Sequence, residues 1–212
     1  PESTLLICDG AQACGHIKID MKGSGIDALA VAGHKGMLGI QGSGALLFSE
    51  RFNPDPVLSG GTGSESNNLG MPDFYPDRLQ SGTLSYPAIV SLGEGVMYLN
   101  ENAEKGAAHT RKLTEYLCKN LFGIRGIKLY SVPNVFGIVT FSMQNMQSEV
   151  AAYNLSEEYS ICVRGGLHCA PLMHKALLSD GLIRASVCAF NSMNECEKFI
   201  QAVENLSSKD RK

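Results

Sequence analysis

Two short apolar runs near the start of the chain end in residues that could act together on a ligand. Asp9 follows the run 5–8, and Lys35 follows the run 28–32 within a Gly-His-Lys-Gly motif. Taken singly, both have ordinary interpretations, because Asp-Gly is most often a turn and a loop lysine is usually solvated. The glycines around Lys35, however, remove side chains and let a ligand approach the backbone closely. An acid and an amine at the ends of neighbouring strands therefore indicate a shared binding site.

The ligand that this pair fits is pyridoxal phosphate. A carboxylate beside the pyridine nitrogen keeps that nitrogen protonated, which makes the ring an electron sink, and a lysine binds the aldehyde as a Schiff base. The amine must be neutral to attack a carbonyl, and both desolvation and a nearby positive charge favour the neutral form. The Gly-rich run 39–44 is not a P-loop, because the GxxxxGK[ST] order is absent.

The stretch 164–171, with the sequence RGGLHCAP, contains the most informative of the seven cysteines. Cysteine is commonly buried as a small hydrophobe, so one thiol among seven is a weak catalytic candidate by counting. Cys169 nevertheless stands in a Gly/His/Pro loop rather than on an apolar face, where Arg164 and His168 could favour the reactive thiolate. A metal site of Cys169, His168 and His174 is an alternative, although no fourth ligand is apparent.

The elements that would position these residues change in type along the chain. The runs 5–8, 28–32 and 44–48 show no in/out alternation, which is typical of strands buried on both faces of a parallel or mixed sheet. Residues 53–86 are rich in Gly, Pro, Ser and Asn and predict a long, irregular, functional loop. An apolar stripe over 87–121 predicts one long helix or two helices end to end.

The second half has the pattern of a compact α+β domain. We expect short strands and helices in alternation, with strands at 127–131, 137–142, 161–164 and 183–187 and helices at 148–159 and from Ser192 onward. The last helix begins with a capping box, Ser192-x-x-Glu195, and then presents an apolar face.

Composition places the chain among soluble globular proteins. Its 212 residues carry 18 Lys and Arg against 21 Asp and Glu, a net charge of -3, and 44% are hydrophobic. The lack of a basic excess argues against a nucleic-acid binder, and no apolar run approaches the roughly 18 residues of a membrane span. An odd number of cysteines without a CxxC pair favours reduced thiols, and hence a cytoplasmic protein, over a disulfide framework or a zinc ribbon. The abrupt start, without a signal-peptide pattern, suggests a fragment.

Four motifs occur in a set order: Asp9-x-Ala11-Gln12, Gly33-His34-Lys35, Gly60-Gly61-Thr62-Gly63 and Gly82-Thr83. Together they resemble the class V aminotransferase family, whose members are pyridoxal-phosphate enzymes of α/β fold type I. The closest branch contains the cysteine desulfurases and selenocysteine lyases, whose R-x-G-x-H-C-A-P signature resembles residues 164–171. The resemblance spans essentially the whole chain but only the C-terminal half of a typical member.

The resemblance implies two domains and a role for each matching residue in the first. Residues 1–98 would be the C-terminal part of the large cofactor-binding domain, and 99–212 the small α+β domain, with a long linking helix near 87–121. Lys35 would bind pyridoxal 5'-phosphate covalently, Asp9 would pair with the pyridine nitrogen, and Gln12 would bond the ring hydroxyl. His34 would contact the phosphate, and Thr83 would reach the phosphate of the opposite subunit's cofactor, which implies a homodimer.

In the second domain the resemblance implies the chemistry of a thiol. Cys169 would attack the sulfur of L-cysteine, or the selenium of L-selenocysteine, releasing alanine and leaving a persulfide that a sulfur-acceptor protein could take. Arg184 would hold the substrate carboxylate with two parallel hydrogen bonds, and Arg164 would orient the same end or support the loop. A structural salt bridge is the ordinary interpretation of Arg184. Another class V reaction, such as transamination, and a truncated non-catalytic subunit are the alternative functions.

Three positions depart from the family pattern. Ala32 stands where Ser or Thr usually bonds the phosphate, Ile40 replaces a usual Pro, and Ser85 stands where Asn is common. Loss of one hydroxyl donor would weaken cofactor binding by about 1–3 kcal/mol if a partner is left unmet. The part of a typical member that the resemblance does not cover would supply early strands, the aromatic group that stacks on the ring, and much of the phosphate cup.

Overall fold

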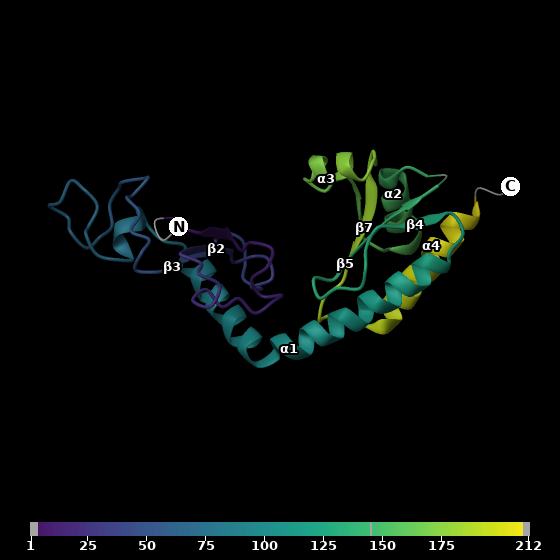
Figure 1. Ribbon diagram of the computed structural model, residues 1–212, viewed down its shortest axis with the longest axis horizontal. Helices are drawn as coiled ribbons and strands as arrows, with labels where there is room; N and C mark the ends of the chain where they lie inside the picture. Colours follow the sequence, from purple (N-terminus) through teal and green to yellow (C-terminus); the bar gives the residue numbers. More distant parts are fainter. Residues whose placement is uncertain (1–3, 145, 210–212) are drawn as a thin grey trace. The chain divides into compact units, whose positions relative to one another are not determined.

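The computed structural model describes residues 4–144 and 146–209 (Figure 1). The chain forms two compact units that divide between Ala103 and Glu104. This division falls inside α1, a single helix of 38 residues, Tyr86–Gly123, so the apolar stripe over 87–121 forms one helix rather than two. No helix in the described part of the chain is long and apolar enough to cross a membrane.

The first unit contains a three-stranded mixed sheet in the order β1-β2-β3. Its strands are β1 (Ile7–Asp9), β2 (Ala28–Ala32) and β3 (Gly44–Phe48). β1 runs parallel to β2, with Asp9 opposite Ala30, and β3 runs antiparallel to β2. The mixed sheet predicted from the sequence is therefore confirmed, and β1 and β2 end at the same edge.

The strands of this sheet are less buried than their composition predicts. Ile7 is 60% exposed, and Leu46 and Leu47 are 45% and 47% exposed, whereas Ala28 and Leu29 in the central strand are buried. The expectation of strands buried on both faces is thus wrong for β1 and β3 within this chain. The physical reason is that little of the described chain packs on Ile7, Leu46 and Leu47, whereas Phe48 at the end of β3 is partly covered by the rings of Phe52 and Tyr75.

A buried acid ties the sheet together at the opposite end from the site residues. The side chain of Asp27 accepts hydrogen bonds from Leu6 N at 2.9 Å and Ser49 Oγ at 3.2 Å, and it forms an ion pair with Arg51 at 3.3 Å. The backbone hydrogen bond from Leu6 is the largest of several effects that lower the pKa of Asp27.

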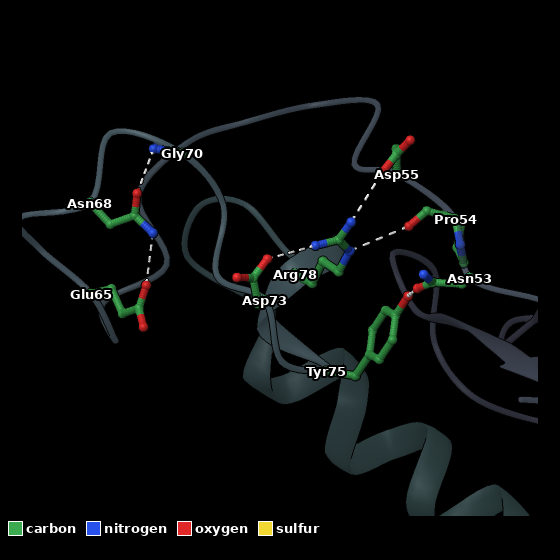
Figure 2. A network of polar contacts seen from close by, with 9 residues as sticks. All are labelled: Asn53, Pro54, Asp55, Glu65, Asn68, Gly70, Asp73, Tyr75 and Arg78. Atoms are coloured by element: carbon green, nitrogen blue, oxygen red, sulfur yellow. Dashed lines mark hydrogen bonds and ion pairs between the residues drawn. The ribbon is translucent and has the colours of Figure 1, made fainter.

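The segment between β3 and α1 is irregular, as its composition predicts, except for the short 3-10 helix η1 (Asp77–Leu79). Figure 2 shows that polar contacts hold it in shape. The guanidinium of Arg78 donates to Asp55 at 3.0 Å, to Asp73 at 3.1 Å and to Pro54 O at 3.5 Å. Nearby, Tyr75 OH donates to Asn53 Oδ1 at 2.7 Å.

The second unit is built on an antiparallel sheet in the order β4-β5-β7-β6. Its elements are β4 (Ile127–Leu129), β5 (Ile138–Met143), α2 (Ser148–Tyr159), β6 (Arg164–Gly166), α3 (Pro171–Ala176), β7 (Leu182–Ser186) and α4 (Met193–Lys209). The pattern predicts these elements well, apart from α3, which it does not predict, and β6, which begins at Arg164 rather than at the predicted residue 161. Both elements flank the Cys169 loop and have only six and three residues, which is too short for a period to show in the sequence.

The C-terminal part of α1 packs with α2, α4 and the sheet around one apolar core. Phe141 on β5 is fully buried, and its ring meets that of Phe199 on α4 edge to face at 6.1 Å. The predicted capping box starts α4, since Ser192 N donates to Glu195 Oε2 at 2.6 Å and Glu195 N donates to Ser192 Oγ at 3.2 Å. This core includes residues of β7, and β6, from which the thiol loop departs, pairs with β7.

Candidate active site

The loops that carry Asp9 and Lys35 leave the same edge of the first sheet. Asp9 is the last residue of β1, and Lys35 lies three residues beyond the end of the parallel strand β2. Gly10 N donates to Ala30 O at 2.9 Å, which extends the pairing past Asp9. Ligands of open α/β sheets bind at this carboxyl edge.

Two glycines lock these loops against each other. A Cβ built on Gly36 would lie 2.3 Å from Cys14 O and 2.8 Å from the ring of His16, and one on Gly15 would lie 2.0 Å from Gly36 O. Gly15 also has a φ of +84°, which side-chain-bearing residues rarely adopt. The loop after β1 and the loop after β2 therefore touch through bare backbone, and their positions are coupled.

The residues of these loops that the sequence predicts to bind the cofactor have exposed side chains. They are Asp9, Gln12, His34 and Lys35. The Oδ1 atom of Asp9 accepts a hydrogen bond from Ala11 N at 2.9 Å, which fixes the direction of the carboxylate. The backbone of Lys35 is held in a turn, since Leu38 N donates to Lys35 O at 3.0 Å. A carboxylate and an amine on two coupled loops, with glycine backbone between them, fit the needs of pyridoxal phosphate.

Thr83 lies at the C-terminal end of the irregular segment, shortly before α1 begins. Gly82 N donates to Gly61 O at 2.8 Å, so the Gly-Gly-Thr-Gly and Gly-Thr motifs meet although the sequence separates them widely. The side chain of Thr83 is exposed. The structure thus brings the motif that contains Thr83 next to the Gly61 motif.

Cys169 stands on a strained loop in the second unit. His168 and Cys169 have consecutive positive φ values of 53° and 58°, which are uncommon for residues with side chains and often mark functional sites. The thiol is exposed. Arg164 Nη2 donates to Cys169 Sγ at 3.4 Å, so a permanent positive charge lies beside the sulfur.

The ring of His168 supports the same loop. His168 Nε2 lies 3.0 Å from Arg164 O, and a carbonyl can only accept, so Nε2 carries the proton. Burial lowers the pKa of His168; the hydrogen bond to Arg164 O opposes this, and the charges of Arg184, His174 and Arg164 lower the pKa further. His168 is therefore neutral near pH 7, with an unprotonated Nδ1.

The alternative interpretation of this loop as a metal site gains no support from the geometry. His168 Nε2 is engaged by a carbonyl, and the buried His174 lies with Nδ1 3.4 Å from Ser179 Oγ. The rings of His168 and His174 meet edge to face at 5.5 Å. Among the described residues, no three His, Cys, Asp or Glu side chains come together as metal ligands would.

Two arginines lie side by side next to the thiol loop. Arg164 on β6 is the register partner of Arg184 on β7, so both side chains leave the same face of the sheet. Neither forms an ion pair with a carboxylate in the described part of the chain. The Nε atom of Arg184 is buried, and it has no hydrogen-bond partner among those residues. Like charges directly opposite each other are unfavourable, so this pair is suited to an external anion such as a carboxylate.

Several residues that shape the site escape sequence reasoning because their contacts are distant along the chain. Gly15 and Gly36 are separated by a strand, and Ser148 bonds Gly166 across 18 positions. The sequence singles out Gly36 through its motif but does not reveal its contact with the loop after β1, and Ser148 carries no signal beyond its place at the start of a helix.

Comparison with known proteins shows which family and which solved structures this chain resembles. The family model of class-V aminotransferases matches residues 2–199. Curated relatives described as probable cysteine desulfurases are 34% identical in Methanothermobacter thermautotrophicus and 31% identical in Pyrococcus abyssi, covering 96% and 97% of this chain. A cysteine desulfurase structure from Thermococcus onnurineus NA1, without ligand, is 30% identical, covers 97% of this chain and superposes with a TM-score of 0.88.

These matches also define how much of the relatives the chain represents. It spans 53% of both curated relatives and 53% of the Thermococcus chain. The cysteine desulfurase CsdA from Escherichia coli, at 22% identity and a TM-score of 0.85, shares the fold, with 95% of this chain and 51% of that chain covered. The expected α/β architecture of fold type I pyridoxal-phosphate enzymes is confirmed by these structures. The chain belongs to the class-V aminotransferase family.

Proposed function

We propose that this chain acts as, or as part of, a pyridoxal-phosphate-dependent cysteine desulfurase. The observation that carries the proposal is that Arg164 and Arg184 lie opposite each other beside the exposed thiol of Cys169. Neither arginine forms an ion pair with a carboxylate among the described residues, and Arg184 Nε has no hydrogen-bond partner there. An amino acid offers the carboxylate that such a pair needs, and a reactive thiol gives the site a nucleophile. The names of two curated relatives, at 34% and 31% identity, support the same activity.

The residues of the first unit would hold the cofactor. Lys35 would bind its aldehyde, Asp9 would bond the pyridine nitrogen, and Gln12 and His34 would bond the ring hydroxyl and the phosphate. When bound, pyridoxal phosphate supplies an electron sink that labilises bonds next to the amino acid's α-carbon. Asp9 is pre-oriented by its bond from Ala11 N, so the carboxylate needs little reorganisation to take this role.

The residues of the second unit would bind the substrate and accept its sulfur. Arg184 would bond the α-carboxylate through its free Nε and its terminal nitrogens, and Arg164 would stabilise the anionic sulfur of Cys169. The thiolate of Cys169 would form a bond to the substrate sulfur while the carbon–sulfur bond breaks. The electron pair of that bond stays with carbon, which takes a proton, so the products are alanine and a persulfide on Cys169.

Further features of the proposal concern assembly and setting. We expect a homodimer in which Thr83, on the irregular segment, reaches the phosphate of the partner's cofactor. L-Cysteine and L-selenocysteine are both candidate substrates, and a separate protein would take the persulfide sulfur. A cytoplasmic location suits seven cysteines that are all free.

The experiment uses the purified protein with saturating pyridoxal phosphate. Borohydride reduction followed by peptide mass spectrometry should locate the cofactor on Lys35, and Lys35→Ala should abolish the adduct. Cys169→Ser should abolish sulfide release from L-cysteine in the presence of a reductant while the adduct on Lys35 persists. Absence of an adduct in the wild-type protein would overturn the proposed cofactor, and undiminished sulfide release by Cys169→Ser would favour a different class V reaction.

A further inference from the structure

We propose that Ser148, at the start of α2, is a positioning residue for the Cys169 loop and acts through the amide of Gly166. Glu149 orients the Ser148 hydroxyl for this purpose. The inference rests on the proposed function only in taking Cys169 as the nucleophile.

The hydrogen bonds around Ser148 have a defined direction. Ser148 is 7% exposed; its Oγ accepts from Gly166 N at 3.1 Å and donates to Glu149 Oε2 at 2.7 Å. A hydroxyl has one proton, so donation to the carboxylate turns an oxygen lone pair toward Gly166. The hydrogen bond from Ser148 is the largest effect that lowers the pKa of Glu149, which keeps the carboxylate ionised and accepting at neutral pH.

The backbone around Ser148 packs closely enough to fix α2 against β6. A Cβ on Gly165 would lie 2.4 Å from Ser148 O, and one on Gly181 would lie 2.7 Å from Ser148 Oγ. The first turn of α2 therefore lies directly on the backbone of β6 and on the turn that leads into β7. Only glycine fits at these positions, which is why Ser148 can reach a strand amide.

Gly166 is the point from which the thiol loop departs. It is the last residue of β6 and has a φ of +102°, a conformation suited to glycine. Three residues later comes Cys169, whose sulfur receives the hydrogen bond from Arg164. Rotation of the Gly166 peptide would swing the loop and separate the sulfur from the guanidinium, and the Ser148 bond opposes that rotation.

The test measures the reactivity of Cys169 in the full chain without cofactor. After brief treatment with iodoacetamide and trypsin digestion, peptide 165–175 reports Cys169 alone and peptide 129–164 reports the exposed Cys162 as an internal reference. Positive charge beside a thiol favours its reactive form, so we expect Ser148→Ala to lower the Cys169-to-Cys162 labelling ratio by about threefold or more. Ser148→Thr retains the hydroxyl and should preserve the ratio.

Two further variants make the result decisive. Ser156→Ala is the same change at an exposed position of α2 and should leave the ratio unaltered. Glu149→Gln, at an exposed side chain, should lower the ratio less than Ser148→Ala does, and it carries the test if Ser148→Ala does not fold by circular dichroism. A wild-type ratio in folded Ser148→Ala, or in Glu149→Gln where Ser148→Ala is unfolded, overturns the proposal.

Enzyme kinetics add a second readout and separate this inference from the proposed function. In active protein, Ser148→Ala should reduce kcat by about tenfold or more with KM little changed, because displacement of the reacting atom by about 1 Å impairs attack more than binding. Labelling needs neither cofactor nor turnover. Protein without desulfurase activity but with a Ser148-dependent ratio would refute the proposed function and leave the positioning role intact.

Discussion

Replacing Gly36 with alanine should push apart the loop after β1, which carries Asp9, and the loop after β2, which carries Lys35. The new Cβ would lie 2.3 Å from Cys14 O and 2.8 Å from the ring of His16. The first distance is about 1 Å shorter than an optimal contact between heavy atoms, and a backbone oxygen cannot rotate away as a side chain can. The loops must therefore separate by roughly that amount.

The magnitude follows from overpacking. Forcing an extra methyl group into a tight site typically destabilises a protein by about 1–3 kcal/mol, so urea unfolding of Gly36→Ala should show a loss of that order. Because the displaced loops bear the acid and the amine, we also expect pyridoxal phosphate to bind about tenfold more weakly, as followed by its visible absorbance in a titration.

Matched variants distinguish this mechanism from a general effect of adding a methyl group. Gly93 lies inside α1 with nothing within 4 Å of a built Cβ, so Gly93→Ala should stabilise the chain by up to about 1 kcal/mol through helix propensity. Gly15→Ala opens the same contact from the other loop, so its combination with Gly36→Ala should destabilise less than the sum of the two. Wild-type unfolding and wild-type cofactor binding by Gly36→Ala would refute the coupling of the loops.

Three further predictions concern stability, each measured by urea unfolding of the full chain. Phe141→Ala should destabilise the second unit by about 3–5 kcal/mol, whereas Phe122→Ala, at a side chain 82% exposed, should change stability by less than about 0.5 kcal/mol. Ser192→Ala removes the cap of α4 and should lower stability by about 1 kcal/mol. Asp27 has a lowered pKa in the folded chain, so its contribution to the free energy of unfolding is present above about pH 4 and disappears as the pH falls through the folded pKa. Asp27→Asn should therefore weaken the loss of stability in acid. An unchanged dependence of stability on acid pH would contradict this role of Asp27.

The sequence predicts local structure well where periodicity or a motif is strong. The strands at 28–32 and 44–48, the helix at 148–159 and the capping box at Ser192 all agree with the structure. It fails at α3 and β6, which are short and lie among glycines, and at the burial of β1. The burial of a strand depends on which elements pack on it, whereas an apolar run in the sequence indicates only that the strand is suited to being covered.

In the candidate site, too, the sequence predicts some features and misses others. Motifs single out Asp9, Lys35 and Cys169, because the chemistry of the side chain is visible in the residue type. The order of these residues does not reveal that Arg164 faces Arg184, since a one-residue change of register would place the two guanidinium groups on opposite faces of the sheet. Contacts that depend on register or on a distant helix become visible only in three dimensions.

The hydrogen bonds and ion pairs of Arg78 make the irregular segment between β3 and α1 sensitive to salt. Its partners Asp55 and Asp73 have side chains that are 94% and 102% exposed, so water and dissolved ions compete directly for these contacts. The apolar core of the second unit does not depend on attraction between charges, so screening by dissolved ions does not weaken it. As ionic strength rises, a protease should accordingly cleave the chain first between Asp55 and Arg78.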